Sequence, residues 1–86
     1  MKLIKISALW CPSCLIMNDM IADIAMELNL DMEEYDYDFD EEIVKGYEPG
    51  RILPVIIIKE DNREIIRIIG EKNKNELLNL IKGSVK

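Results

Sequence analysis

The chain has 86 residues, of which 49% are apolar and 33% charged, and 17 acidic side chains against 11 basic ones give a formal net charge of −6. A chain of this length supports one compact domain, residues 1–86, and its apolar content excludes intrinsic disorder. The acidic composition without a basic cluster argues against nucleic-acid binding, and the short apolar runs exclude a membrane span.

Histidine is absent, and the sequence contains two cysteines. Because histidine is the commonest general base and metal ligand, Ser-His or Cys-His hydrolysis and most zinc chemistry are excluded. Residues 1–7 lack the apolar run of a secretory signal, and the C-terminus carries no anchor or retention signal. We therefore expect a cytoplasmic protein, in which two closely spaced cysteines are more often catalytic or metal-binding than structural.

The first half of the chain predicts a strand, a long helix and a second strand. Residues 2–8 alternate and are rich in isoleucine, which indicates a strand. From residue 12 to about residue 30 apolar side chains follow a 3.6-residue period, which predicts an amphipathic helix that ends near Asn29. The apolar positions of this helix are Ile16, Met17, Met20, Ile21, Ile24, Ala25 and Leu28.

The second strand is expected at residues 32–38, where apolar and acidic side chains alternate strictly. Its apolar side carries Tyr35, Tyr37 and Phe39. Its other side is acidic, which suits an exposed sheet edge because charge discourages pairing with another chain.

The second half predicts a short helix and a β-hairpin. Residues 40–45 form the helix candidate, with Gly46 as a left-handed stop. Two β-branched runs, residues 55–59 and 64–69, are separated by a turn at residues 60–63 and indicate a hairpin.

A final helix is expected to begin at Asn73, which forms a capping box with Glu76, to run to about Lys82, and to stop at Gly83. Its buried residues are predicted to be Leu77, Leu78, Leu80 and Ile81. The order β-α-β-α-β-β-α predicts a small α/β fold, a four-stranded mixed sheet flanked by helices.

Cys11 and Cys14 form a Cys-x-x-Cys motif between the first strand and the long helix. With Cys11 as the N-cap and Pro12 as the first helical residue, the free N–H groups of Ser13 and Cys14 would point at the Cys11 sulfur. These donors and the helix dipole would stabilise a Cys11 thiolate. Cys14 lies one turn deeper on the same face, where it can attack a mixed disulfide formed by Cys11. We therefore predict Cys11 as the nucleophile and Cys14 as the resolving cysteine.

Half of a zinc site has the same Cys-x-x-Cys spacing. The chain has no third cysteine and no histidine, so a closed zinc site would require a dimer or carboxylate ligands. We expect no bound metal.

The segment Trp10-Cys11-Pro12-Ser13-Cys14 resembles the active-site signature of the thioredoxin family. Residues 52–58 are similar to the family's cis-proline segment and the strand after it. Gly70, followed by a capped amphipathic helix, is similar to the family's C-terminal part. The resemblance covers nearly the whole chain and implies a minimal thioredoxin fold, without the extra N-terminal strand and helix of full-length thioredoxins; glutaredoxins share this smaller size.

The resemblance also implies a substrate-binding set around the cysteines. Pro54 would be cis and lie across from Cys11, with the Leu53 backbone pairing to an extended substrate segment. Trp10 would form an apolar lip beside the disulfide, although a core aromatic is the alternative. Pro12 and Gly70 complete the set.

One departure from the family concerns proton transfer. In thioredoxins a buried aspartate six residues before the first cysteine assists proton transfer at the second, and here this position is Lys5. The usual lysine partner on the neighbouring strand falls at Glu34. We hypothesise that a charge-swapped Lys5–Glu34 pair modulates the deprotonation of Cys14; the alternative is two solvated strand residues.

Three functions are open at this point. The resemblance implies a monomeric reductant of protein disulfides with no bound cofactor, which receives electrons from NADPH through a flavin-dependent, thioredoxin-reductase-like enzyme. A glutathione-dependent, glutaredoxin-like reductase is the second, supported by the chain length and Pro12. A non-enzymatic module that senses redox state or binds metal is the third. Trp10 and Leu53-Pro54 favour the first, whereas Gly70-Glu71 is only a fragment of the glutaredoxin pattern that holds glutathione.

Overall fold

The structure is a computed structural model that describes residues 1–84. The strands are β1 (Lys2–Ser7), β2 (Asp31–Asp36), β3 (Val55–Glu60) and β4 (Arg63–Ile69), and the helices are α1 (Pro12–Glu27), α2 (Glu41–Tyr47) and α3 (Lys74–Ser84). The sheet order is β2-β1-β3-β4, with β1 and β2 parallel and the other two pairs antiparallel. This confirms the predicted element order and the four-stranded mixed sheet.

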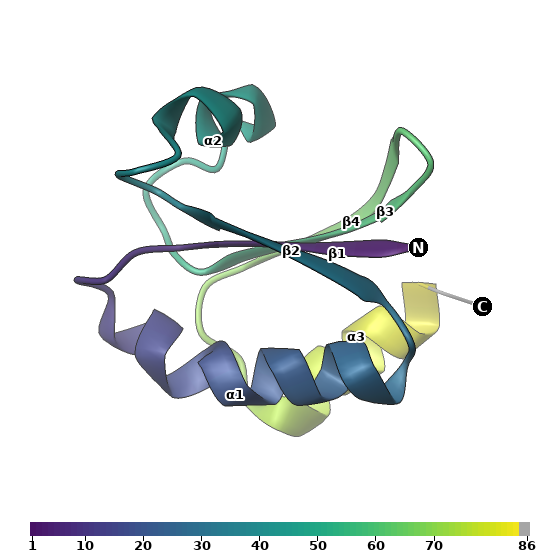
Figure 1. The fold of residues 1–86 in the computed structure, drawn as a ribbon. Coiled ribbons are helices and arrows are strands. Elements are labelled where there is room, and N and C mark those ends of the chain that lie inside the picture. The colour runs from purple at the N-terminus through teal and green to yellow at the C-terminus, as the bar shows by residue number, and fades with distance from the viewer. Residues whose placement is uncertain (85–86) are drawn as a thin grey trace.

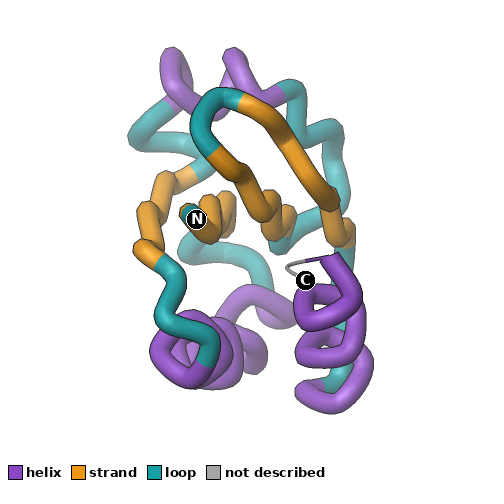
Figure 2. Tube along the Cα trace, turned by 90° about the vertical axis from the view of Figure 1, so that its right-hand side faces the viewer, coloured by secondary structure: helices purple, strands orange, loops and turns teal. Residues whose placement is uncertain are grey.

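The helices cover the two faces of the sheet unequally. Figure 1 shows α1 and α3 side by side on one face and α2 on the other, and the rotated view in Figure 2 agrees. The face toward α1 and α3 is filled by Leu3, Met17, Ile21, Ile24, Ala25, Ile56, Ile58, Ile68, Leu77 and Ile81. The other core cluster contains Ile4, Ile6, Ala8, Cys11, Cys14, Val44, Leu53, Val55 and Ile57. The central strand β3 is buried on both faces, which explains its continuous β-branched run.

β2 lies at the sheet edge, as predicted, but is shorter than expected. The carboxylate of Asp36 accepts hydrogen bonds from the backbone N–H groups of Asp38 and Phe39, at 2.9 and 3.0 Å, and so turns the chain at residue 36. The prediction of a strand to residue 38 with Phe39 on its apolar side is therefore wrong, and Phe39 is 78% exposed.

The ends of α1 and α2 also differ from the prediction. α1 ends at Glu27, and Asn29 adopts a left-handed φ of 56°, so the predicted end near Asn29 is confirmed but the helix is shorter than expected. Ile16, predicted on its apolar face, is exposed. α2 continues through Gly46 to Tyr47, and the left-handed residue is Glu48, so the predicted stop at Gly46 is wrong.

In α3 the predicted cap is confirmed, because Asn73 Oδ1 accepts the N–H of Glu76 at 2.9 Å. Leu77 and Ile81, one turn apart, are buried, whereas Leu80 on a different face of the helix is 40% exposed and was wrongly predicted as buried. The helix passes through Gly83 to Ser84, so the predicted stop at Gly83 is wrong.

The β3–β4 hairpin closes with a two-residue turn at Asp61 and Asn62, shorter than the predicted turn at residues 60–63. Both strands are extended accordingly. A register shift between Ile58 and Lys59 marks a β-bulge near this turn.

Candidate active site

The end of β1 and the start of α1 hold the cysteine pair. Cys11 has an extended backbone (φ −95°, ψ 109°) and is the N-cap of α1, with Pro12 at the first turn. Its Sγ accepts the backbone N–H of Cys14 at 3.2 Å, and its own N–H donates to the carbonyl of Ala8 at 3.2 Å. The predicted N-cap is thus confirmed, with the Cys14 N–H as the donor to sulfur, whereas the second predicted donor, the N–H of Ser13, makes no hydrogen bond to Cys11 Sγ. This geometry places the positive end of α1 and one hydrogen-bond donor at the Cys11 sulfur.

Both cysteines are free thiols, and Cys14 is the deeper one. Cys11 is 5% exposed and Cys14 is 1% exposed. Burial, followed by the hydrogen bond with Cys11, raises the pKa of Cys14 from 9.0 to about 11. Cys14 therefore keeps its proton at neutral pH, and its thiol lies next to the Cys11 sulfur that it could attack.

A buried cation lies on the strand that leads to the cysteines. Lys5 is 5% exposed, and its Nζ lies 2.9 Å from Glu34 Oε1, on the residue that it opposes in β2. The same Nζ donates to Asn18 Oδ1 at 2.8 Å. The contact between Lys5 and Glu34 agrees with the sequence hypothesis, and the burial of Lys5 contradicts the alternative of two solvated residues. The sequence reasoning missed Asn18, although its place one turn after Cys14 on α1 was a signal.

The Leu53–Pro54 peptide bond is cis, as the resemblance implied. Leu53 is buried in the same core cluster as Cys11 and Cys14. The carbonyl of Pro54 accepts the N–H of Gly70 at 3.0 Å, and Gly70 has a left-handed φ of 87°. Three of the predicted substrate-binding residues, Leu53, Pro54 and Gly70, are therefore directly connected.

Trp10 lies on the surface beside Cys11. It is 60% exposed, and its indole N–H donates to Asp38 Oδ2 at 2.7 Å. Its ring meets Tyr37 edge-to-face, with ring centroids 6.3 Å apart. The surface location contradicts the core-aromatic alternative, and the contacts fix the ring in place. Asp38 was not among the predicted site residues, because its partner is distant in sequence.

A second contact missed by the sequence reasoning holds the residue between the cysteines. Ser13 Oγ donates to Glu71 Oε1 at 2.7 Å, which ties the first turn of α1 to the segment after β4. Pro12, next to Ser13, is exposed. Leu9, two residues before Cys11, is also exposed, so apolar side chains flank the cysteine loop on the surface.

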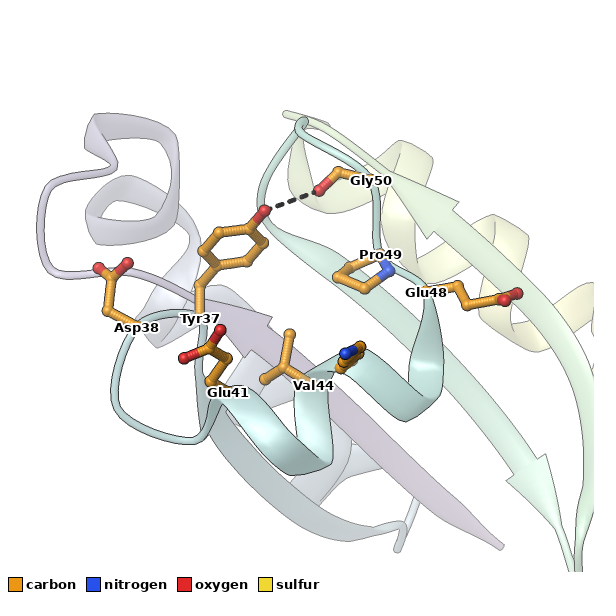
Figure 3. Close-up of a pocket in the computed structure, with 8 residues that line it drawn as sticks. Tyr37, Asp38, Glu41, Val44, Glu48, Pro49 and Gly50 are labelled. Carbon is orange, nitrogen blue, oxygen red and sulfur yellow. Dashed lines mark hydrogen bonds between the residues drawn. The ribbon is translucent and has the colours of Figure 1, made fainter.

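An open pocket of about 660 Å³ adjoins Trp10 through its two contact residues, Tyr37 and Asp38. Figure 3 shows the pocket between α2 and the segment that follows it, with the Tyr37 hydroxyl donating to the carbonyl of Gly50 at 3.3 Å. The remaining lining residues are Glu41, Val44, Lys45, Glu48 and Pro49.

Within residues 1–84 there is no group of three or more cysteine, aspartate or glutamate side chains that could hold a metal ion. None of the helices in this part of the chain is long and apolar enough to cross a membrane.

Comparison with known proteins places this site in a family. The family model "Thioredoxin" matches residues 1–83. A thioredoxin of Chlamydia pneumoniae is 30% identical over 80 residues, which cover 92% of this chain and 78% of that protein. Among solved structures, thioredoxin 1 of Thermosipho africanus TCF52B superposes with a TM-score of 0.87 at 24% identity, over 96% of this chain and 92% of that one. A mutant thioredoxin of Halobacterium salinarum NRC-1 has a TM-score of 0.84 at 19% identity, over 98% of this chain and 74% of that one.

The family match spans nearly the whole described chain and includes the cysteine pair at the start of α1. The chain therefore belongs to the thioredoxin family, whose members are thiol–disulfide oxidoreductases.

Proposed function

We propose that this protein reduces protein disulfides, with Cys11 as the nucleophile and Cys14 as the resolving cysteine. The observation that carries the proposal is the position of Cys11 Sγ at the start of α1, where it accepts the Cys14 N–H at 3.2 Å. A thiolate is the attacking species in thiol–disulfide exchange, and a helix N-terminus stabilises that charge. Cys14, with its raised pKa, stays protonated until the second step.

The reaction consists of two exchange steps. The Cys11 thiolate attacks one sulfur of the substrate disulfide, which forms a mixed disulfide and releases the other substrate sulfur as a thiolate. Cys14 then loses its proton to solvent and attacks Cys11 Sγ. The Cys11–Cys14 disulfide forms, and the second substrate sulfur leaves with the electron pair and is protonated by water. Two electrons have passed from the dithiol to the substrate.

The substrate would bind across the exposed surface around Cys11. Trp10 and Pro12 supply apolar contacts beside the nucleophile, and Trp10 is held by Asp38. An extended substrate segment would pair with the backbone of Leu53, at the cis bond to Pro54, next to Gly70. Backbone pairing is independent of side-chain identity, which suits an enzyme that acts on more than one protein disulfide.

The proposal extends to electron supply and context. The thioredoxin match supports NADPH as the electron source, through a flavin-dependent reductase, rather than glutathione. The protein would act as a single-domain monomer in the cytoplasm, without a bound cofactor, as part of electron transport for cell redox homeostasis. Its partners would be proteins with disulfides, with neither nucleic acid nor membrane among them.

Serine substitutions separate the two cysteine roles. In a coupled assay with a protein disulfide, Cys11→Ser should abolish turnover, and Cys14→Ser should accumulate a covalent mixed disulfide with the substrate, detected by mass spectrometry. Accumulation with Cys11→Ser instead would show that the roles are reversed. If a substrate disulfide does not oxidise Cys11 and Cys14 of the wild-type protein to a disulfide, the proposed function is overturned.

A second measurement tests the electron donor. The oxidised protein is mixed either with NADPH and a thioredoxin reductase or with reduced glutathione, and formation of the two thiols is followed. We expect efficient reduction by the first system. Efficient reduction by glutathione alone would show that the glutaredoxin-like alternative is correct.

A further inference from the structure

Lys5 is a buried charge that the two exchange steps above leave without a role. Lys5 is 5% exposed, and no other charged residue within residues 1–84 is buried. Two oxygen atoms from different elements hold its Nζ: Glu34 Oε1 from β2 at 2.9 Å and Asn18 Oδ1 from α1 at 2.8 Å. Burying an ammonium is unfavourable unless it is paired in this way, so these two contacts are what keep the cation inside the fold.

Asn18 connects the Lys5 cation to the helix that carries Cys14. Asn18 follows Cys14 by four residues on α1, so the two side chains lie on the same helix face one turn apart. Lys5 contacts Asn18 from β1, the strand that leads into the cysteine loop. The charge of Lys5 lowers the pKa of Cys14 and so opposes the larger effect of burial.

The other neighbours of this pair add no competing positive charge. Cys14 also faces Cys11, whose hydrogen bond and charge raise the pKa of Cys14. Lys5 faces the Glu34 carboxylate on the β2 side and the apolar Ile56 on the β3 side. Glu34 is 56% exposed along its side chain, so water screens its charge more than that of Lys5.

We propose that Lys5 is a positioning residue for the second exchange step: its ammonium, held by Asn18 and Glu34, stabilises the Cys14 thiolate by its charge and does not accept the proton. An ammonium has three N–H donors and no acceptor, so Lys5 cannot take the Cys14 proton, and the step keeps water as the acceptor. The bond changes remain those given above. The inference rests on the proposed roles of Cys11 and Cys14.

A small aromatic disulfide whose released thiolate absorbs visible light separates the two steps. In a single turnover the attack by Cys11 releases one thiolate, and the attack by Cys14 releases the second. The test variant is Lys5→Met, which removes the charge and keeps an unbranched side chain of similar size. The matched control is Lys2→Met, which removes an exposed lysine of the same strand that pairs with Glu33 at 3.2 Å.

We expect Lys5→Met to lower the rate of the second thiolate release, and to leave the rate of the first release within about twofold of the wild-type rate. A nearby opposite charge shifts a pKa by about 1–3 units. Because the charge of Lys5 is the smallest of the effects on the pKa of Cys14, we take the lower end, about one unit, which lowers the thiolate fraction about tenfold. The more basic thiolate is a better nucleophile by about threefold, so the net slowing is about three- to fourfold. Lys2→Met should leave both phases unchanged. If the second release has the same rate in Lys5→Met and in Lys2→Met, the inference is overturned. If the wild-type protein shows no first release, the proposed function is overturned instead.

A pH titration of the Cys14 Cβ signal by NMR measures the pKa of Cys14 directly, which separates loss of the Lys5 charge from loss of packing. The pKa of Cys14 should rise in Lys5→Met. In Glu34→Gln, which removes the carboxylate that partly cancels the Lys5 charge, it should fall. If Lys5→Met does not fold, the exposed Glu34→Gln substitution decides: a fall in the pKa of Cys14 supports the inference, and an unchanged or raised pKa of Cys14 overturns it.

Discussion

The left-handed backbone at Gly70 makes the link between β4 and the Pro54 segment sensitive to a single methyl group. Gly70 has a φ of 87°, and a Cβ placed there would lie 3.4 Å from Ile52 Cγ2. A left-handed conformation costs an L residue about 1–2 kcal/mol, and alanine offsets about 0.4–1 kcal/mol of this by restricting the unfolded chain. Ile52 is exposed and can move away, so its contact adds little. We expect Gly70→Ala to lower the free energy of unfolding by about 1 kcal/mol.

A second glycine gives a control with the opposite sign. Gly46 lies inside α2, and a Cβ there meets no atom within 4 Å. Gly46→Ala should therefore raise the free energy of unfolding by about 0.5–1 kcal/mol, because alanine favours the helix. Urea denaturation of the reduced proteins measures both, and each kcal/mol should also move the melting temperature by about 4–8 °C. A Gly70→Ala variant as stable as the wild type would refute the reasoning, as would destabilisation by Gly46→Ala.

Three further predictions address the cap, the resolving thiol and the surface aromatic. Asn73→Ala should lower the free energy of unfolding, measured by urea denaturation, by about 1 kcal/mol, whereas Asn75→Ala inside the same helix should not lower it. Equal decreases in the two variants would contradict the capping role of Asn73. Because burial raises the pKa of Cys14 from 9.0 to about 11, the reduced native state binds more protons than the unfolded state in that range. Its stability should then fall as the pH rises from 9 to 11, more steeply than in Cys14→Ala, and identical slopes would contradict this. Asp38→Ala should release Trp10 and lower kcat/KM for a protein disulfide about fivefold, with reduction of a small aromatic disulfide unchanged, and an equal loss for both substrates would show a wider disturbance.

The order of elements could be predicted because each element has a local periodic signal. The 3.6-residue pattern of α1 and the β-branched run of β3 are both local properties of the sequence. The ends of elements were predicted less well, since they depend on particular side chains. Asp36 ends β2 through two hydrogen bonds to its own turn, and α2 passes Gly46 because a glycine permits a left-handed stop without requiring one.

The site was predicted unevenly for a related reason. The cysteine geometry follows from a strand, a proline and a helix that are adjacent in sequence, so local reasoning was sufficient. The contacts of Trp10 with Asp38 and of Ser13 with Glu71 join residues 28 and 58 positions apart, and no local pattern carries them. The cis bond before Pro54 came from the family resemblance alone, since a proline at the start of a strand is ordinarily trans.

Because the sequence has no histidine, the buried charge of Lys5 matters more for the chemistry of the two thiols. Without an imidazole, the sequence has no side chain that exchanges protons near neutral pH at its ordinary pKa, so the two thiols depend on fixed charges and dipoles. The start of α1 supplies a fixed dipole to Cys11, and β1 supplies a fixed cation to the region of Cys14. The two devices act on different cysteines, so each step of the exchange can be weakened separately, which is why Lys5→Met is expected to slow the second release and spare the first.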